Sequence, residues 1–338
     1  MKLNFCIILI ILSSTFAISK RFDLTNEQIT NTAFPLFQNF IKDNNKTYSS
    51  IEEYSERFSI FHQNLLRIKT TQDNDKGAEY NINRFADLSS EEFEAYFLGE
   101  IDTNQHKSMS FLSDAEYELT YKGLEIPESF DWREKNVVSP VKNQGFCGAC
   151  WAFSATQVVE SHIAIKTGKL NILSPQQLVD CDRTEHGCGG GLHFRALDYI
   201  AQKGMVSEKD YPYSGHRHNC TVNESQIVAK VKGYKNITSD ENEMAKAIVE
   251  FGPLAVGLEA SNFQFYWSGI SDPYCSKRNN HAVLLVGYGR GRDWLFREKD
   301  FWIIKNSWGS WWGEKGYIRL VRGREACGIT KVPSIPIV

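Results

Sequence analysis

Long apolar runs are missing from this chain of 338 residues once its first 17 residues are passed. A helix that crosses a bilayer needs roughly 20 mostly apolar residues, so we expect a soluble mature chain with no membrane-spanning segment. The sequence also lacks a basic stripe with interleaved aromatic residues, which argues against nucleic-acid binding. It has no internal repeat and no low-complexity segment. The chain that follows the first 17 residues is long enough to form one large domain, or two moderate domains, with a hydrophobic core.

Residues 1–17 have the features of a secretory signal peptide. Lys2 precedes a short apolar run at 5–12, and small residues follow as far as Ala17. The run is too short for a membrane anchor. Sequons for N-glycosylation, which favour a secretory route, occur at Asn45, Asn219, Asn223 and Asn236. We therefore expect the protein in the secretory pathway, with the lysosome or the extracellular space as its destination.

Charge divides the chain into two parts. Residues 1–125 carry 12 Lys and Arg against 19 Asp and Glu, a net charge of −7, whereas residues 126–338 carry 26 against 22, a net charge of +4. The first part is helical in pattern, because an apolar stripe along 51–70 steps by three and four residues and the Ser-Ser-Glu-Glu at 89–92 can start another helix. Residues 101–125 are polar and aperiodic, which is typical of an extended connector open to proteolysis.

The second part has helical patterns first and strand patterns afterwards. A helix is expected to begin close to Cys150 and to end at Gly168, with two more beginning at Ser174 and covering 192–203. The expected strands, separated by glycines, cover 227–232, 254–258, 281–286, 301–305 and 317–321. Because helices and strands do not alternate, the pattern favours an α+β body in two lobes.

The number of cysteines is informative. The chain has 8, of which Cys6 lies in the signal segment, so an odd number remains for an oxidising compartment. Cys147 and Cys150 flank two small residues and could form a redox dithiol, half of a metal site, or a nucleophile beside a structural cysteine. A redox pair is expected near a βαβ pattern, and a metal site needs further ligands at matching spacing; the sequence offers neither. A free Cys150 beside a bonded Cys147 fits the odd number.

A free thiol at Cys150 needs a partner to become a thiolate. A helix N-terminus contributes roughly 0.3–2 kcal/mol, whereas an imidazolium partner lowers a thiol pKa from about 8.5 to roughly 3–4. His281 at the start of an apolar strand and Asn306 at the end of the next could complete a Cys/His/Asn set. His162 is expected to pack on its helix. The histidines expected to lie solvated in loops are His186, His193, His216 and His218.

Three blocks of the sequence resemble the catalytic blocks of the papain-like cysteine proteases, the family of the lysosomal cathepsins. They read PVKNQGFCGACWAFS, NHAVLLVGYG and KNSWGSWWGEKGYIRL. The first part of the chain is similar to cathepsin L-type propeptides. The positions that match the two propeptide motifs are Glu53, Arg57, Phe61, Asn64 and Ile68 and then Asn83, Phe85 and Asp87. Gln72 and Asn81 depart from these motifs, and residues 240–254 are similar to cathepsin O.

The resemblance implies a fold and a division into domains. The fold would be α+β and two-lobed, with a helical left lobe, a β-barrel-like right lobe and an N-terminal helical inhibitory propeptide. The signal peptide would cover 1–17, the propeptide 18–125 and the mature papain-like peptidase 126–338. The implied disulfides join Cys147 with Cys188, Cys181 with Cys220, and Cys275 with Cys327.

The same resemblance implies roles for individual residues. The catalytic ones are Cys150 as nucleophile, His281 as general acid and base, Asn306 as the residue that orients the imidazole and Gln144 as an oxyanion donor. The implied substrate-binding residues are Gly190, Gly191, Leu192, Val332, Trp308 and Trp312. Because position 332 is not acidic, the pocket of Leu192 and Val332 should prefer apolar side chains to arginine. His193 would narrow that pocket, and Gly189 stands where the family has Asn.

Together these features predict a secreted or lysosomal cysteine endopeptidase, made as an inactive proenzyme and activated by removal of its propeptide. We expect no cofactor and no metal ion. The expected partners are protein and peptide substrates, the chain's own propeptide as intramolecular inhibitor, and inhibitors of the cystatin type, with the enzyme a monomer. Two alternatives stay open at this point: a catalytically inactive papain-like binding protein, and a secreted redox protein that uses Cys147 and Cys150.

Overall fold

The computed structural model of the protein describes residues 22–99, 101, 124–276 and 278–338. The expected signal peptide and residues 102–123 of the expected connector lie outside the described residues. Within the described ranges, no helix combines the length and the apolar composition that crossing a membrane requires.

The described residues up to 101 are called the prosegment below. Its elements are α1 (Asn26–Asp43), α2 (Ile51–Asn74), β1 (Ala78–Tyr80) and α3 (Ser90–Phe97). The apolar stripe expected along 51–70 forms in α2, where Phe61 is fully buried. Phe61 packs on Phe37 of α1 with 5.2 Å between ring centroids. The stripe therefore holds α1 and α2 together.

The chain enters α3 through contacts made by residues of the propeptide motifs. Ser89 caps the helix: its hydroxyl accepts from the N–H of Glu92 at 3.2 Å, and its own N–H donates to the Glu92 carboxylate at 2.9 Å. The same carboxylate pairs with Arg57 of α2 at 2.6 Å. The Asn64 amide donates to two main-chain oxygens just before α3, at 2.8 and 2.9 Å. These contacts fix the position of α3 against α2.

Gln72 and Asn81, the two residues that differ from the propeptide motifs, both make contacts in the structure. Gln72 is buried at the end of α2, donates from Nε2 to the Ala78 oxygen at 2.8 Å and accepts at Oε1 from the Tyr80 N–H at 3.1 Å. It thus fastens β1 to α2. The N–H of Asn81 donates to the oxygen of Phe265 in the rest of the chain, at 2.9 Å.

The remainder of the chain, called the body, begins at residue 124. Its α-helices, over the described residues, are α5 (Cys150–Thr167), α6 (Pro175–Cys181), α7 (His193–Lys203) and α8 (Glu241–Phe251). α5 ends at Gly168, whose φ of 71° is a conformation that glycine adopts without strain. A short ribbon pairs β3 (Met205–Val206) with β4 (Ile227–Ala229).

The main sheet has nine strands among the described residues, and the prosegment contributes one of them. The strands from the body are β2 (Phe130–Asp131), β5 (Gly233–Asn236), β6 (Leu254–Leu258), β7 (Tyr266–Ser271), β8 (His281–Arg292), β9 (Glu298–Lys305), β10 (Tyr317–Val321) and β11 (Ser334–Ile337). Their order is β1-β7-β10-β9-β8-β6-β11-β5, with β2 paired to β8. β7 and β10 run parallel, and the other pairs are antiparallel. Strand β1 thus extends the sheet at the outer edge of β7.

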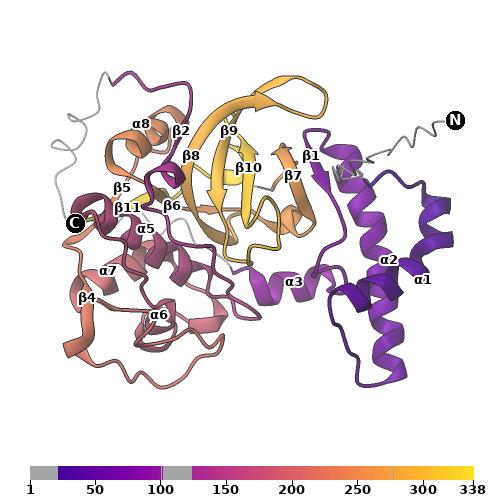
Figure 1. Cartoon of the computed structure of the whole chain (residues 1–338), viewed down its shortest axis with the longest axis horizontal. Coiled ribbons are helices and arrows are strands. Elements are labelled where there is room, and N and C mark those ends of the chain that lie inside the picture. Colours follow the sequence, from indigo (N-terminus) through magenta and orange to yellow (C-terminus); the bar gives the residue numbers. More distant parts are fainter. Residues whose placement is uncertain (1–21, 100, 102–123, 277) are drawn as a thin grey trace, which may run out of the picture.

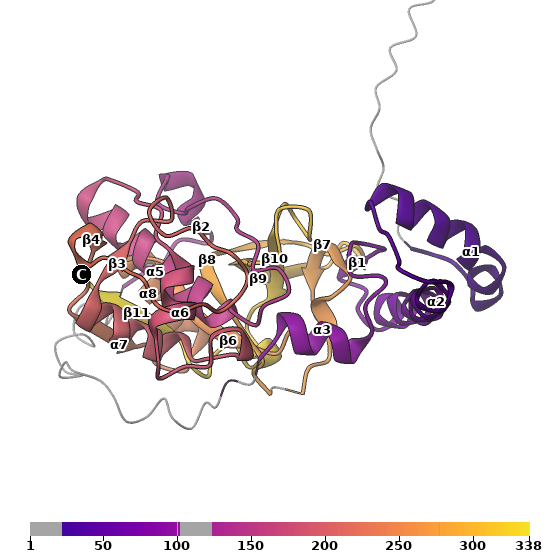
Figure 2. The same ribbon diagram turned by 90° about the horizontal axis from the view of Figure 1, so that it is seen from below.

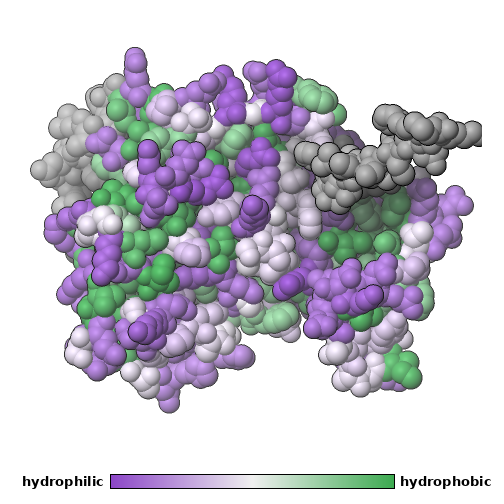
Figure 3. Space-filling view, in the orientation of Figure 1, coloured by the Kyte–Doolittle hydropathy of each residue, from purple (hydrophilic) through white to green (hydrophobic). Residues whose placement is uncertain are grey.

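The three parts lie side by side. Helices α5, α6 and α7 form one lobe, the sheet forms the central lobe, and α1 and α2 lie beyond the far edge of the sheet (Figure 1). α3 runs from α2 back towards the junction of the two lobes (Figure 2). Polar side chains cover most of the face in Figure 3, and apolar ones gather over the helical lobe.

The apolar core is divided in a way that involves the prosegment. The buried side chains of α1, α2 and α3 belong to the same cluster as those of the sheet lobe, including Phe37, Phe93, Trp302 and Trp308. A second cluster, which contains Cys150, joins the helical lobe to other side chains of the sheet, such as Leu284 of β8, and to Ile101 of the prosegment. The prosegment and the sheet lobe therefore share one core.

Candidate active site

Cys150 is the first residue of α5, and its thiol is free and only 2% exposed. Ala149 precedes the helix and gives it no side-chain cap, so the first N–H groups of the helix are open towards the sulfur. Burial raises the pKa of the thiol to about 11, against the opposing effect of the main-chain N–H groups of Ala282, Trp151 and Cys150 itself. Ala282 follows His281, so the thiol of one lobe touches the strand of the other.

His281 begins β8, and Asn306 follows β9, which pairs with β8. The Nε2 atom of His281 lies 2.7 Å from Oδ1 of Asn306. Because that oxygen accepts, Nε2 carries the proton and Nδ1 is the basic nitrogen of the neutral ring. Nδ1 is buried and has no hydrogen-bond partner among the described residues. The neutral ring therefore keeps one buried nitrogen that can accept a proton.

Both candidate catalytic groups are neutral in this state of the protein. Burial lowers the pKa of His281 to about 4, although the hydrogen bond with Asn306 acts in the opposite direction. The pKa of Cys150 is raised, whereas the sequence led us to expect a thiolate. The difference follows from the burial of both side chains, which removes the water that would solvate an ion pair.

Gln144 lies fully buried beside the start of α5, and its carboxamide has a fixed orientation. Oε1 accepts from the hydroxyl of Ser307 at 2.6 Å, and the Gln144 N–H donates to the Ser307 oxygen at 2.8 Å. Nε2 donates to the main-chain oxygens of Cys147 at 3.0 Å and of Phe97 at 3.2 Å. Phe97 belongs to the prosegment. The main-chain oxygen of Phe97 thus accepts a hydrogen bond from Gln144 Nε2, the donor that would otherwise bind an oxyanion.

The end of the prosegment crosses the cleft in an extended conformation. The N–H of Gly99 donates to the oxygen of Asn280 at 2.7 Å, and the N–H of Ile101 donates to the oxygen of Asn279 at 3.0 Å. A side chain at Gly99 would come within 3.4 Å of the Cα of Gly190, so the two backbones lie in close contact. The prosegment therefore covers the strip between Gly190 and the residues that precede His281.

Leu192 and Val332 lie in one apolar cluster, together with Ile101 of the prosegment and Cys150. Val332 is fully buried and Leu192 is 5% exposed. A side chain at Gly257 would come within 3.2 Å of Ile101 and 2.9 Å of Val332, so Ile101 fills this pocket. The prosegment thus places an apolar side chain where the sequence predicted an apolar subsite.

The expectation of a solvated His193 is wrong. His193 is the first residue of α7, is fully buried, and bonds through Nε2 to the oxygen of Val332 at 2.9 Å. It supports the pocket from behind. His186, His216 and His218 are exposed, as expected. His162 is buried in α5, bonded to the Pro253 oxygen at 2.9 Å.

The two candidate tryptophans lie one behind the other. Trp308 packs on the ring of His281 with 4.7 Å between centroids, and Trp312 packs on the far side of Trp308 at 4.9 Å. Prosegment rings cover Trp308, among them Phe93 at 5.2 Å. Trp308 is therefore the one that faces the cleft, while Trp312 supports it and donates to the oxygen of Phe263 at 3.1 Å.

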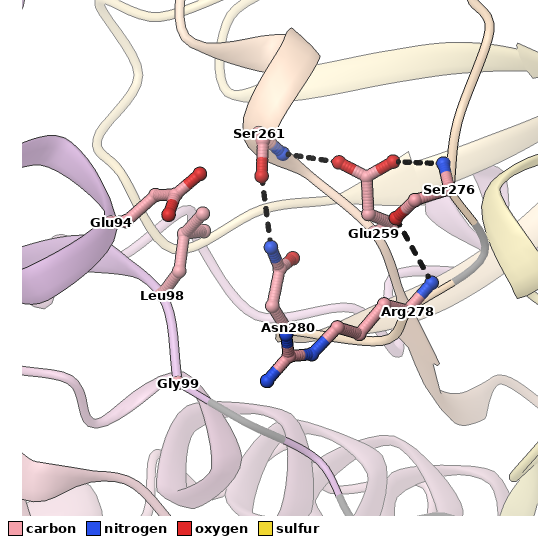
Figure 4. A pocket seen from close by; sticks show the side chains of 8 residues that line it. All are labelled: Glu94, Leu98, Gly99, Glu259, Ser261, Ser276, Arg278 and Asn280. Carbon is pink, nitrogen blue, oxygen red and sulfur yellow. Dashed lines mark hydrogen bonds between the residues drawn. The ribbon is translucent and has the colours of Figure 1, made fainter. Parts of the chain in front are cut away.

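A pocket of about 320 Å³ lies beside this site, between α3 and the segment that leads into His281 (Figure 4). Its lining residues are Glu94, Leu98 and Gly99 from the prosegment and Glu259, Ser261, Ser276, Arg278 and Asn280 from the body. Asn280 donates to the hydroxyl of Ser261 at 3.0 Å, and the Glu259 carboxylate accepts from the N–H of Ser276 at 2.9 Å. The prosegment thus forms part of the wall of this pocket.

The cysteines other than Cys150 form three disulfides in the described structure. The pairs are Cys147–Cys188, Cys181–Cys220 and Cys275–Cys327, the same as the resemblance implies. The first of them ties the loop that carries Gln144 to the turn Gly187–Gly189, and so it fixes two sides of the cleft to each other.

The sequon asparagines differ in exposure. Asn45, Asn219 and Asn223 are exposed, whereas Asn236 is half-buried at the end of β5. No three side chains of His, Cys, Asp or Glu in the described ranges gather in a way that could hold a metal ion.

Sequence reasoning missed two residues that hold Gln144 in place. Ser307 orients the carboxamide, and the hydroxyl of Tyr213 donates to the Gln144 main-chain oxygen at 2.7 Å. Ser307 follows Asn306 in the third of the three sequence blocks, and this position indicated a place in the site. Tyr213 lies in a loop with no such signal.

Comparison with known proteins agrees with this geometry. The model of the papain family cysteine protease matches residues 126–337, and that of the cathepsin propeptide inhibitor domain (I29) matches residues 37–93. The chain is 43% identical over 312 residues to cysteine proteinase 15A of Pisum sativum, covering 88% of this chain and 85% of that protein. It is 41% identical over 313 residues to pro-cathepsin H of Mus musculus, covering 89% of this chain and 90% of that protein.

Solved structures agree as well. Digestive procathepsin L 3 of the Tenebrio molitor larval midgut superposes with a TM-score of 0.77 at 37% identity, covering 90% of this chain and 99% of that one. The predicted α+β, papain-like fold with a propeptide is thereby confirmed, while the likeness to cathepsin O stays a prediction. The chain belongs to the papain family of cysteine proteases and carries a cathepsin-type inhibitor propeptide in front of its protease domain.

Proposed function

We propose that this protein is a secreted or lysosomal cysteine endopeptidase in which Cys150 is the nucleophile, His281 the general acid and base, Asn306 the orienting residue and Gln144 an oxyanion donor. One arrangement carries the proposal. Asn306 forms a hydrogen bond with Nε2 of His281, and Nδ1 of the same ring has no hydrogen-bond partner among the described residues. The main-chain N–H of the next residue, Ala282, lies against the Cys150 sulfur. This arrangement supports a base and a thiol that act in one site between the two lobes.

The proposed mechanism begins when the prosegment leaves and water enters the cleft. Nδ1 of His281 takes the thiol proton of Cys150, and the charged pair is now solvated. The thiolate attacks a peptide carbonyl, while Gln144 Nε2 and the Cys150 N–H hold the oxyanion. His281 then gives its proton to the departing amine as the C–N bond breaks, leaving a thioester. Water, deprotonated by His281, cleaves the thioester and restores the thiol.

Active-site labelling tests this proposal. We expect a peptidyl epoxysuccinate to alkylate the acid-processed protein at one sulfur, that of Cys150, with loss of peptidase activity in proportion to labelling. Mass spectrometry of the tryptic peptides identifies the site. Absence of labelling would support an inactive binding protein instead. Labelling of both Cys147 and Cys150 after mild reduction would support a redox protein.

The domain limits and the destination of the protein belong to the same proposal. We place the signal peptide at 1–17, the propeptide at 18–125 and the peptidase at 126–338. The sequons and the disulfides support a route through an oxidising compartment to the lysosome or the outside of the cell. Glycans are proposed at Asn45, Asn219, Asn223 and Asn236.

The substrates that we propose are proteins and peptides cut at internal bonds. No long insertion separates Cys188 from Cys220, so the cleft should be open at both ends. The propeptide acts as intramolecular inhibitor, and inhibitors of the cystatin type would enter the same cleft in a monomeric enzyme. We propose neither a cofactor nor a metal ion for the reaction.

The pocket of Leu192 and Val332 should select an apolar side chain. We expect a Phe-Arg reporter to be cleaved at least about tenfold faster, in kcat/KM, than an Arg-Arg reporter, because an arginine in this pocket would be buried without a counter-charge. Fluorogenic assays on the processed enzyme measure both. In the variant Val332→Glu the carboxylate supplies the counter-charge, so the preference should shift towards Arg-Arg. Equal cleavage of both reporters by the unmodified enzyme would contradict an apolar pocket.

A further inference from the structure

A phenylalanine that is largely exposed lies close to the candidate oxyanion donor. Phe146 stands between Gln144 and Cys150 in the loop that leads into α5, and it is 63% exposed although the prosegment is in place. A single exposed apolar residue is ordinary on a folded protein, so exposure alone gives Phe146 no role. The rings that surround it are more informative.

Two aromatic rings of the prosegment pack on Phe146. The ring of Tyr96 meets it edge to face, with 5.4 Å between centroids, and the ring of Phe97 lies at 5.5 Å. Phe97 is also 6.4 Å from the ring of Trp308. Aromatic rings attract one another over such separations, in edge-to-face and tilted arrangements. Phe146 and Trp308 therefore hold one prosegment ring in common, that of Phe97.

The course of the prosegment shows on which side of the cut bond these rings lie. Ile101 fills the apolar pocket described above, which we take to receive the second residue before the cut. The main-chain oxygen of Phe97 accepts from Nε2 of Gln144 at 3.2 Å, where the carbonyl of the cut bond would be held. The path from Ile101 to Phe97 thus leads towards the part of a substrate that departs as the amine. Phe146 and Trp308 contact the ring at the end of that path.

The backbone on both sides of Phe146 is fixed. Gly145 has a φ of 60°, which glycine adopts without strain, and its N–H donates to Oδ1 of Asn143 at 3.1 Å. On the other side, Cys147 is bonded to Cys188. A ring on a backbone that is already ordered loses little conformational freedom when it binds another group. Phe146 is therefore placed in advance for contact with a ligand.

We propose that Phe146 is a specificity-determining residue, whose ring forms with Trp308 a site for an aromatic side chain directly after the cut bond. Phe97 of the prosegment occupies this site in the proenzyme and leaves it when the prosegment is removed. The inference rests on the function proposed above and deepens it, because it names a class of substrate: peptides that carry an aromatic residue on the leaving side of the bond.

Competition between two peptides on the processed enzyme tests the proposal. Both peptides carry Phe-Arg before the cut bond and differ only in the next residue, which is phenylalanine in one and leucine in the other. We expect the phenylalanine peptide to be cleaved roughly two- to tenfold faster in kcat/KM, because an aromatic pair adds about that much to apolar burial. Mass spectrometry of the products gives the ratio and confirms the position of the cut. In one mixture the ratio does not depend on the amount of active enzyme.

Three variants assign the preference to the ring. Phe146→Leu keeps an apolar side chain at an exposed position but removes the ring, so the ratio should fall at least about twofold. Phe146→Tyr keeps the ring and should keep the ratio. Phe296→Leu is the matched control, because Phe296 is 81% exposed at the tip between β8 and β9 and lines a different pocket. Its ratio should equal that of the unmodified enzyme.

Two results would overturn the proposal: equal cleavage of the two peptides by the unmodified enzyme, or an unchanged ratio in Phe146→Leu. Either would leave Phe146 as a contact of the prosegment alone. Failure of the processed protein to label or to cleave any peptide would instead overturn the proposed function. In that case the Kd values of the two peptides decide the role of Phe146, measured on the Cys150→Ala proenzyme processed in trans, with and without Phe146→Leu.

Discussion

Replacing Gln144 by alanine should lower kcat by about two to three orders of magnitude, with KM changed little. The reason is that Nε2 of Gln144 is a fixed donor at the cleft, and loss of one oxyanion donor typically costs about 3–4 kcal/mol in the transition state. Ser307 fixes the orientation of that donor, because its hydroxyl donates a hydrogen bond to Oε1 of Gln144 at 2.6 Å. Initial rates on the acid-processed enzyme measure the effect. Ser307→Ala should produce a smaller fall in kcat, because the carboxamide is then free to rotate.

A matched control exists in the helical lobe. Gln177 is also fully buried, with its carboxamide bonded to the oxygen of Gly204 at 2.9 Å and to the N–H of Val206 at 2.8 Å. Gln177→Ala should reduce thermal stability to a similar extent as Gln144→Ala and leave kcat nearly unchanged. If Gln144→Ala retains normal kcat, or if the two variants lose kcat equally, Gln144 does not stabilise an oxyanion.

Exposure of the proenzyme to about pH 4 should release a species that begins at about Ile126, and peptidase activity should appear where almost none was present at neutral pH. The hydrogen bond from Arg57 holds the pKa of Glu92 below its ordinary value, against an opposing effect of burial. The contribution of Glu92 to stability is therefore present above about pH 4.5 and is lost as the pH falls further. Protonation breaks the 2.6 Å pair that holds α3 to α2.

Two carboxyl groups of the body respond to acid in the opposite sense. Burial raises the pKa of Glu185 to about 7 and that of Asp198 to about 6, so the ionised forms that weaken the body at neutral pH disappear in acid. Two buried histidines of the body oppose this gain, because burial lowers the pKa of His162 and of His281 to about 4 and acid favours their charged, exposed forms. The expected processing therefore rests on loss of the pair between Glu92 and Arg57.

N-terminal sequencing and a fluorogenic peptide assay follow the processing. Glu92→Gln should process at a higher pH than the unmodified proenzyme, because the pair with Arg57 is already weakened. Glu91→Gln, one residue away and hydrogen-bonded to Ser89 at 2.8 Å rather than to Arg57, is the control and should shift the pH of processing less than Glu92→Gln does. An unprocessed and inactive protein after incubation near pH 4 would contradict acid activation.

Strong local patterns predicted much of the fold. α5 begins at Cys150 and is followed by Gly168, and β6 and β10 have the expected bounds of 254–258 and 317–321. In these segments apolar periodicity and a terminating glycine agree, so local preference and tertiary packing select the same structure. The candidate residues Cys150, His281 and Asn306 also stood at the ends of such elements.

Elements that depend on distant partners could not be predicted in the same way. β5, β7 and β11 were missed, since each contains glycine or proline and is defined by its pairing with distant strands. His193 was misjudged because its partner, the oxygen of Val332, is 139 residues away. The neutral state of Cys150 and His281 was also beyond the sequence, since it arises from their burial in the folded chain.

The shared core of the prosegment and the sheet lobe affects how the released enzyme persists. A chain cut near Ile126 keeps the sheet lobe but gives up side chains, such as Phe37 and Phe93, that are buried in one core with it. Equilibrium stability measured on the intact precursor therefore does not describe the processed form, which lacks these buried contacts. The three covalent cross-links survive the cut and limit how far an opened chain can expand.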